Sequence, residues 1–236
     1  MNLTKSAITL LSVITLLMTG CGAETGSPYN EFTEFVKKTN LLKSGKLRMT
    51  PIPGTDRSHI PGEAVDEYIR LFDRLQCTRD SAFILCYYHD DGLGGEPHLV
   101  ASTTRTSPDD WMQTDDRSIY EWIEENDAQK FMVPKEDTPM AYFQYLFFQV
   151  YGEQFALYWH ANYNRREILL EHPEKGMSSS REPLIDVALK EDQCIVTLYE
   201  ENHEDISQVT FGIGRKAPWV ITREDRVITE KPKVMY

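Results

Sequence analysis

The last fifth of the chain is a series of short apolar runs separated by polar turns, and this pattern restricts the fold more than any other feature of the sequence. The runs lie between residues 194 and 230 and read CIVTLYE, QVTFGIG, PWVIT and RVITE. Runs of this length that are rich in Val, Ile, Thr and aromatic residues predict β-strands. Short connections join antiparallel neighbours. We therefore expect several antiparallel strands here.

Four other segments predict α-helices. Apolar residues recur at helical spacing over 28–42 and over 65–75, and a short helix is expected after Asp115. The fourth segment is the aromatic tract MAYFQYLFFQVYG, which is preceded by Thr138 and Pro139 and ends at Gly152. A strand is the alternative for this tract. A helix is favoured because the N-terminal cap and the terminal glycine agree.

Two hairpins are also expected, one with strands near 82–89 and 98–104, the other turning at 162–165. The glycine- and proline-rich stretch 43–62 predicts an irregular connection. Together these elements predict an α+β fold in which helices pack on a largely antiparallel sheet.

The N-terminus has the pattern of a targeting segment. Residues 7–18 form an apolar run in which no charge occurs, and Lys5 is the only charge before it. The run is shorter than the roughly 20 residues that a membrane-spanning helix needs. It therefore predicts an export signal rather than a membrane span.

The run ends in the sequence LMTGC at Cys21, which resembles the lipobox of bacterial lipoproteins. That resemblance implies cleavage before Cys21, a lipid on its thiol, and localisation at a membrane of the cell envelope. Gly22 follows where an aspartate typically retains such proteins in the inner membrane, so the outer membrane is expected in a Gram-negative organism. An ordinary secretory signal is the alternative.

This interpretation divides the chain into a signal peptide (1–20), a flexible tether (21–29) and a single α+β domain (30–236). The formal net charge is −12, and it becomes −13 when residues 1–20 are removed with Lys5. Such a surplus of carboxylates repels nucleic-acid phosphates, so nucleic acid is not the expected partner. A composition with 41% apolar and 11% aromatic residues predicts a folded domain.

Three cysteines remain in the domain: Cys77, Cys86 and Cys194. An oxidising compartment would allow one disulfide, and Cys77 and Cys86 are the candidate pair because they are near in sequence. Three free buried thiols are the alternative. The spacing matches no CxxC redox or zinc pattern.

Two groups of residues are weak candidates for a binding site. The predicted turn from His89 through Asp91 to His98 carries imidazoles and carboxylates that could converge on a metal, although Asp and Gly are also ordinary turn residues. The second group is Tyr158, His160 and Tyr163, where a histidine between tyrosines could act as a general base or a binding contact. A hydrogen-bonded structural histidine is the alternative there. We expect no metal and no cofactor.

Residues 212–217 read GIGRKA and match the GxGxxA pattern of dinucleotide sites. Such a site needs a helix that opens at the loop and an acidic residue about 20 positions later. Pro218 follows at once, so we interpret the match as chance.

Two classes of function follow from these observations. The first is a lipid-anchored, non-enzymatic envelope protein that binds another envelope protein as an accessory factor. The second is an anchored hydrolase or small-ligand-binding protein that uses His160 or the His89–His98 turn. A deep pocket with a histidine beside a carboxylate or hydroxyl would favour the second class.

Overall fold

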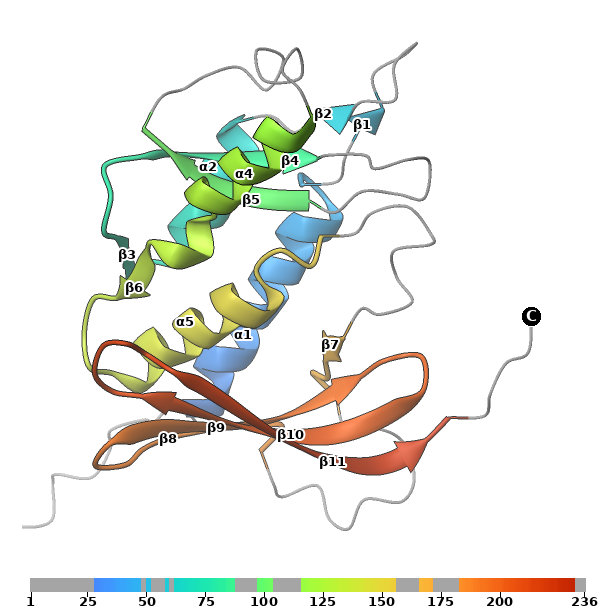
Figure 1. Ribbon diagram of the computed structural model, residues 1–236. Helices are drawn as coiled ribbons and strands as arrows, with labels where there is room; N and C mark the ends of the chain where they lie inside the picture. The colour runs from blue at the N-terminus through green and yellow to red at the C-terminus, as the bar shows by residue number, and fades with distance from the viewer. Residues whose placement is uncertain are drawn as a thin grey trace, which may run out of the picture.

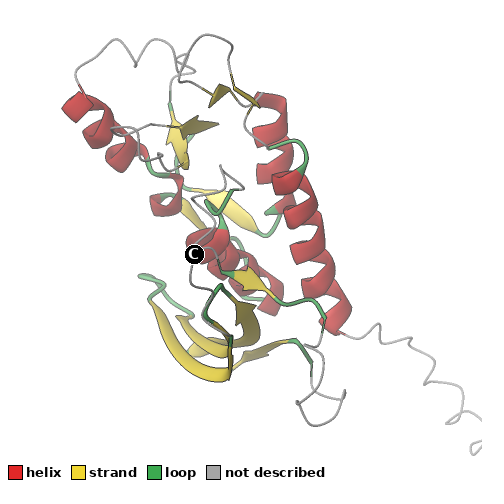
Figure 2. Ribbon diagram, turned by 90° about the vertical axis from the view of Figure 1, so that its right-hand side faces the viewer, coloured by secondary structure: helices red, strands yellow, loops and turns green. Residues whose placement is uncertain are grey.

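The computed structural model describes residues 28–47, 50–51, 58–59, 62–87, 97–103, 116–155, 166–171 and 183–231. Their fold is a mixture of helices and antiparallel strand pairs, so the predicted α+β class is confirmed. The α-helices are α1 (Pro28–Ser44), α2 (Gly62–Leu71), α4 (Asp116–Asn126) and α5 (Pro139–Tyr151), with a 3₁₀ turn, η1 (Ala128–Lys130). Figure 2 shows these helices and the strands between them.

The C-terminal strands form a five-stranded antiparallel sheet at one end of the molecule (Figure 1). Its strands are β7 (Glu167–Ile168), β8 (Ile185–Leu189), β9 (Gln193–Glu201), β10 (Asp205–Gly214) and β11 (Ile221–Glu230). The order is β11, β10, β9, and both β7 and β8 pair with the remaining edge of β9. β8 lies along the first half of β9, from Cys194 to Leu198, and β7 pairs with its last residues.

Three smaller antiparallel pairs account for the other strands. They are β1 (Thr50–Pro51) with β2 (Ser58–His59), β3 (Leu75–Cys77) with β6 (Met132–Pro134), and β4 (Ala82–Tyr87) with β5 (Pro97–Ser102). The β4–β5 pair confirms the first predicted hairpin. The second predicted turn, at 162–165, lies outside the described residues.

One hydrophobic cluster joins side chains of α1, α2 and α5 with those of β8, β9 and β10. Phe72 illustrates its packing: the ring makes edge contacts with Phe35, Tyr68 and Phe148 at centroid distances of 5.4, 5.1 and 5.0 Å. Edge-to-face contacts of this kind add to the free energy gained from burying the rings. The cluster connects elements that are distant in the sequence.

Helix α5 follows the sequence prediction at both ends. Its N-cap is Thr138, whose hydroxyl accepts a hydrogen bond from the Ala141 amide at 3.3 Å, and Pro139 opens the first turn. Gly152 comes directly after the helix with right-handed dihedral angles, φ −56° and ψ −42°. A Cβ atom there would lie 2.2 Å from the Phe148 carbonyl oxygen, so close packing, not a left-handed backbone, requires the glycine.

Two predicted boundaries are wrong. Helix α2 ends at Leu71, so Phe72 lies in a turn and Leu75 begins β3, although both side chains are buried as expected. The runs PWVIT and RVITE predict two strands, but only one strand, β11, forms here. It contains Ile221 and Thr222 of the first run and the whole second run, and it pairs with β10 apart from one bulge. The predicted irregular connection 43–62 contains the end of α1 and the short β1–β2 pair.

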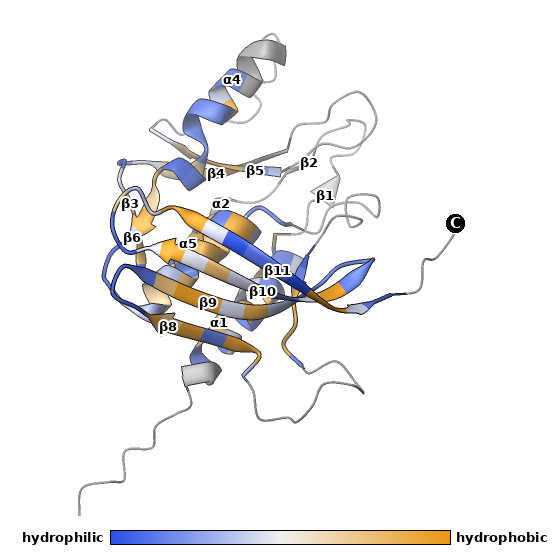
Figure 3. Ribbon diagram, turned by 60° about the horizontal axis from the view of Figure 1, so that its bottom comes forward, coloured by the Kyte–Doolittle hydropathy of each residue, from blue (hydrophilic) through white to orange (hydrophobic). Residues whose placement is uncertain are grey.

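The face of the sheet that contacts α5, called here the inner face, changes character along its length. Hydropathy also changes across the whole sheet: Figure 3 shows orange bands on β8 and β9, whereas the middle of β11 is blue. The apolar residues of this face are Ile185, Val187, Leu189, Cys194, Val196, Leu198, Val209, Phe211, Ile213 and Ile221. Glu200, Arg223 and Asp225 make its other end polar.

Candidate functional site

Glu200 on β9 lies at the centre of the polar end of the inner face of the sheet, and only 3% of its surface is exposed. The Tyr151 hydroxyl and Arg223 Nη1, at 3.1 Å, donate to its Oε1. Its Oε2 accepts from Arg223 Nη2 at 2.6 Å and from Arg166 Nη1 at 3.3 Å. A carboxylate offers about four acceptor sites. All four are therefore used by protein donors.

Asp225 completes this group of side chains, which we call the Glu200 network. Its carboxylate lies 2.8 Å from Arg223 Nε and 3.8 Å from Arg166 Nη1. The Arg223 guanidinium also lies 5.2 Å from the centre of the Phe211 ring. Two arginines and two carboxylates thus balance in charge, which is the condition for keeping ionised groups in a partly buried place.

The surroundings of Glu200 and Tyr151 shift the pKa values of both side chains. Burial raises the pKa of Glu200, and the Tyr151 hydrogen bond and Arg166 act in the opposite direction. Burial and the charge of Glu200 raise the pKa of Tyr151 well above its ordinary value. Tyr151 is therefore a fixed hydrogen-bond donor at neutral pH.

A groove with a volume of about 480 Å³ lies beside this network, between α1, the end of α5 and β7. Its polar lining residues are Lys37, Asn40, Lys43, Ser44, Tyr151, Gln154, Arg166 and Glu167. Its apolar lining residues are Val36, Leu41, Phe147, Ile168 and Leu170. The groove therefore offers both charged groups and an apolar surface to a ligand. Its volume is within the roughly 300–1,000 Å³ of ligand-binding pockets.

Lys43 of α1 supplies a buried positive charge to this groove, with only 2% of its surface exposed. Its ammonium group donates to the Tyr151 carbonyl oxygen. Three aromatic rings surround it, with centroids 5.2 to 5.8 Å from Nζ: Tyr68, Phe147 and Phe155. Contacts with ring faces stabilise a cation in such a place.

Arg166 connects the Glu200 network to the groove. Its side chain is 41% exposed, and Nη1 makes both of its ion pairs, to Glu200 and Asp225. Within the described ranges, Nε and Nη2 make no hydrogen bond to the protein, and the same holds for the side-chain amide of Asn40. The groove therefore has donors that are positioned but unused by the described residues.

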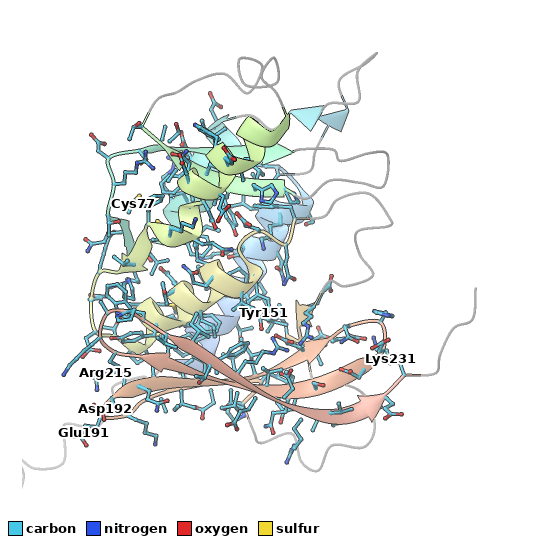
Figure 4. All side chains as sticks on the ribbon, viewed as in Figure 1. Cys77, Tyr151, Glu191, Asp192, Arg215 and Lys231 are labelled. Atoms are coloured by element: carbon cyan, nitrogen blue, oxygen red, sulfur yellow. The ribbon has the colours of Figure 1, made fainter. Side chains whose placement is uncertain are left out.

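A second cluster lies at the other end of α5 and the sheet. Arg215 donates to Asp137 with two nitrogens, Nε at 2.9 Å and Nη2, and the Tyr142 hydroxyl donates to the same carboxylate at 2.9 Å. Arg215 Nη1 donates to the carbonyl oxygens of Lys190 and Glu191. Figure 4 shows Arg215 beside Glu191, far along the sheet from Tyr151. This cluster joins the start of α5 to two sheet turns.

Most residues predicted from sequence to form a site cannot be placed. Cys21, His89, Asp91, Tyr158, His160 and Tyr163 lie outside the described residues. His98 lies on β5, opposite Cys86, and is partly buried. No group of three or more His, Cys, Asp or Glu side chains is placed to hold a metal within the described part of the chain.

Cys77 and Cys194 are free thiols in the structure, and the bridge considered from Cys77 to Cys86 stays a prediction. The side chain of Cys86 is outside the described residues. Cys194 is fully buried, and burial raises the pKa of its thiol to about 12. A thiol that is protonated and shielded reacts slowly, because the thiolate is the nucleophile.

The GxGxxA match has no dinucleotide-binding geometry. Gly212 and Gly214 lie in β10, and the chain turns from there into β11 instead of opening a helix. A Cβ atom at Gly212 would lie 2.7 Å from side-chain oxygens of Gln193 and Thr222. Side chains of the neighbouring strands β9 and β11 thus crowd the position of a side chain at Gly212, and no bound nucleotide is needed to explain the glycine.

Glu200, Arg166 and Arg223 are not among the site residues predicted from the sequence. One signal was present: in the run CIVTLYE, Glu200 continues the alternation of Cys194, Val196 and Leu198, all of which are buried. Alternate residues of a strand share a face. A charge at the next inward position therefore predicts a buried carboxylate, for which basic partners must be sought.

Comparison with protein-family models, with curated proteins and with solved structures finds no match to this chain. None of the helices in the described part of the chain is long and apolar enough to cross a membrane.

Proposed function

We propose that this chain is an exported bacterial lipoprotein, held at a membrane by a lipid on Cys21, preferably the outer membrane of a Gram-negative cell. Residues 1–20 would be removed as the signal peptide, 21–29 would form the tether and its junction with α1, which begins at Pro28, and 30–236 would form a single domain whose helices pack on the sheet. The export signal and the LMTGC sequence support this proposal.

The domain acts by binding another envelope protein, as an accessory factor, rather than by catalysis. The observation that carries this proposal is the groove, where the half-exposed side chain of a fixed arginine, Arg166, meets an apolar lining. Leu41 is 75% exposed beside it and adds apolar surface. Exposed apolar surface next to polar groups is typical of protein-interaction sites.

The Glu200 network supports a binding role because it is saturated. A general base needs a free lone pair within reach of a substrate proton. The oxygens of Glu200 already accept four hydrogen bonds, and its carboxylate is buried. We assign the network a structural task, which is to hold Arg166 in place.

A small-ligand-binding protein is the second candidate, favoured by the groove volume of about 480 Å³. The third possibility considered above, a hydrolase centred on His160 or on the His89–His98 turn, depends on residues outside the described part of the chain.

Two comparisons test the proposal. Replacing residues 1–21 with an ordinary cleavable signal should release the protein from the membrane fraction, because two or three acyl chains at Cys21 are the expected anchor. Affinity capture from detergent-solubilised membranes should then recover a partner with wild-type protein and lose it with Arg166→Gln.

Arg226→Gln is the matched control for the capture experiment. It removes the same charge from an exposed arginine of β11, whose register with Gln208 places it on the face opposite Asp225. A partner retained by both variants would show that the groove is not the binding site. Quantitative membrane association without residues 1–21 would refute the anchor.

A further inference from the structure

We propose that the groove between α1, α5 and β7 binds the C-terminal end of a partner polypeptide, with the terminal carboxylate on Arg166 and an apolar last side chain against Leu41, Ile168 and Leu170. This inference rests on the proposed function and names the chemistry of its partner. The groove residues and the free donors of Arg166 carry it.

The guanidinium of Arg166 has the geometry that a carboxylate requires. Nη1 is held by Glu200 and Asp225, which leaves Nε and Nη2 free of the described residues. These two nitrogens lie on one side of the planar fork and donate in parallel directions. Arginine binds carboxylates through such paired donors. The Glu200 network fixes the fork, so little side-chain freedom is lost on binding.

The unused donors of the groove favour an anion over a cation. The lining carries three basic side chains, Lys37, Lys43 and Arg166, and one acidic side chain, Glu167. Lys37 pairs with Glu34 on the surface, and Arg166 pairs with Glu200 and Asp225 through Nη1. The remaining nitrogens of Arg166, Nε and Nη2, can donate hydrogen bonds but cannot accept them, so they are complementary to a terminal carboxylate.

The remaining lining distinguishes a polypeptide from a fatty acid, which would also present a carboxylate on an apolar chain. Asn40, Ser44 and Gln154 bring amide and hydroxyl groups to the walls. Ser44 Oγ and Gln154 Nε2 donate to the Leu41 and Val150 carbonyl oxygens, but an acyl chain would offer no partner to the Asn40 amide or to the acceptor oxygens of Ser44 and Gln154, which is unfavourable. The amide and carbonyl groups of a peptide main chain would pair with them. A peptide terminus therefore satisfies both the polar and the apolar lining.

The test uses the full-length protein in detergent and two random hexapeptide pools that differ only at the C-terminus, one with a free carboxylate and one amidated. We expect the protein to retain the carboxylate pool, enriched in apolar last residues, and not the amide pool. Individual retained peptides should bind at least about tenfold more weakly to Arg166→Gln, because the variant loses the charged pair of donors and even one charge-assisted hydrogen bond accounts for a loss of that size. Arg226→Gln should bind them as wild type does.

Arg166→Lys provides a second variant with the charge preserved. It should recover only part of the affinity, because an ammonium group cannot offer the planar pair of donors. The near-ultraviolet circular dichroism spectrum and thermal midpoint of each variant show whether it is folded. If Arg166→Gln does not fold, the affinity of Arg166→Lys for the retained peptides is compared with that of wild type instead.

Three outcomes would overturn the inference: equal retention of the two pools, retention of neither, or binding of decanoate without binding of the carboxylate pool. The last outcome would show that the occupant is a small amphiphile. Failure of the inference is distinct from failure of the proposed function. If membrane capture still recovers a partner with Arg166→Gln, the accessory role stands and the C-terminal binding mode does not.

Discussion

The two ends of α5 are tied to the sheet by two clusters that share one arrangement, a tyrosine hydroxyl and an arginine on one carboxylate, but lie in different surroundings. The second cluster also contains Arg166 and Asp225. At the start of the helix, Tyr142 and Arg215 donate to Asp137, whose side chain is 54% exposed. At its end, Tyr151 and Arg223 donate to Glu200, which is buried.

This difference in burial changes what each cluster contributes. Water and salt screen exposed ion pairs, so the Asp137 cluster adds little to the free energy of unfolding. Glu200 has no water to replace a lost partner, so each of its donors matters. The buried cluster also reaches a groove, through Arg166. The Asp137 cluster therefore joins α5 to the sheet at the surface, whereas the Glu200 network also positions a residue of the groove.

Removing each carboxylate gives the largest expected difference. Glu200→Ala leaves Arg223 and Tyr151 without their buried acceptor and should lower the free energy of unfolding by about 3–5 kcal/mol. Asp137→Ala should lower it by no more than about 1 kcal/mol, as for other exposed pairs. Urea unfolding of both variants measures the difference. Equal losses would mean that burial is not what distinguishes the clusters.

A finer comparison removes one hydroxyl from each cluster. Tyr151→Phe should lower the free energy of unfolding by about 1.5–3 kcal/mol, because it deletes a buried hydrogen bond to a charged group. Tyr142→Phe should lower it by about 0.5–1.5 kcal/mol, since solvent can replace the bond to exposed Asp137. Both rings keep their packing. Urea denaturation curves with unchanged slopes would make the two values comparable, and a reversed order would contradict the comparison.

The ends of α5 and the burial of Glu200 could be predicted from the sequence, but the side chains that donate to Glu200 could not. Thr138, Pro139 and Gly152 predicted both ends of α5 because helix caps are local. The alternation in CIVTLYE places Glu200 on the buried face. Its donors come from positions 23, 34 and 49 residues away, however. No local pattern links residues so separated.

Tertiary contacts also explain the errors in element boundaries. The polar residues Arg223 to Arg226 suggested a break between two strands, but β10 pairs with this stretch, and the inward side chains Arg223 and Asp225 have ionic partners. At the end of α2, the apolar spacing continued to Leu75 although the helix did not. Gln144 of α5 instead bonds to the Leu71 carbonyl and the Arg74 amide, which stabilises the turn.

The smallest expected effect concerns the exposed cluster and its dependence on pH. Hydrogen bonds from Arg215 and Tyr142 lower the pKa of Asp137 below its ordinary value of 3.8. A carboxyl group whose pKa is lower in the folded state contributes stability above its ordinary pKa. That contribution is lost as the pH falls through the pKa of the folded state.

Asp137→Asn removes this contribution. Wild type should therefore be slightly more stable than Asp137→Asn at pH 6, and the gap should close as the pH falls below 3.8. Urea unfolding at a series of pH values between 6 and 3 measures it, and 1 M salt should shrink the gap at pH 6 because the pair is exposed. A gap that is unaffected by both acid and salt would show that Asp137 acts through packing, which would remove the contrast with Glu200.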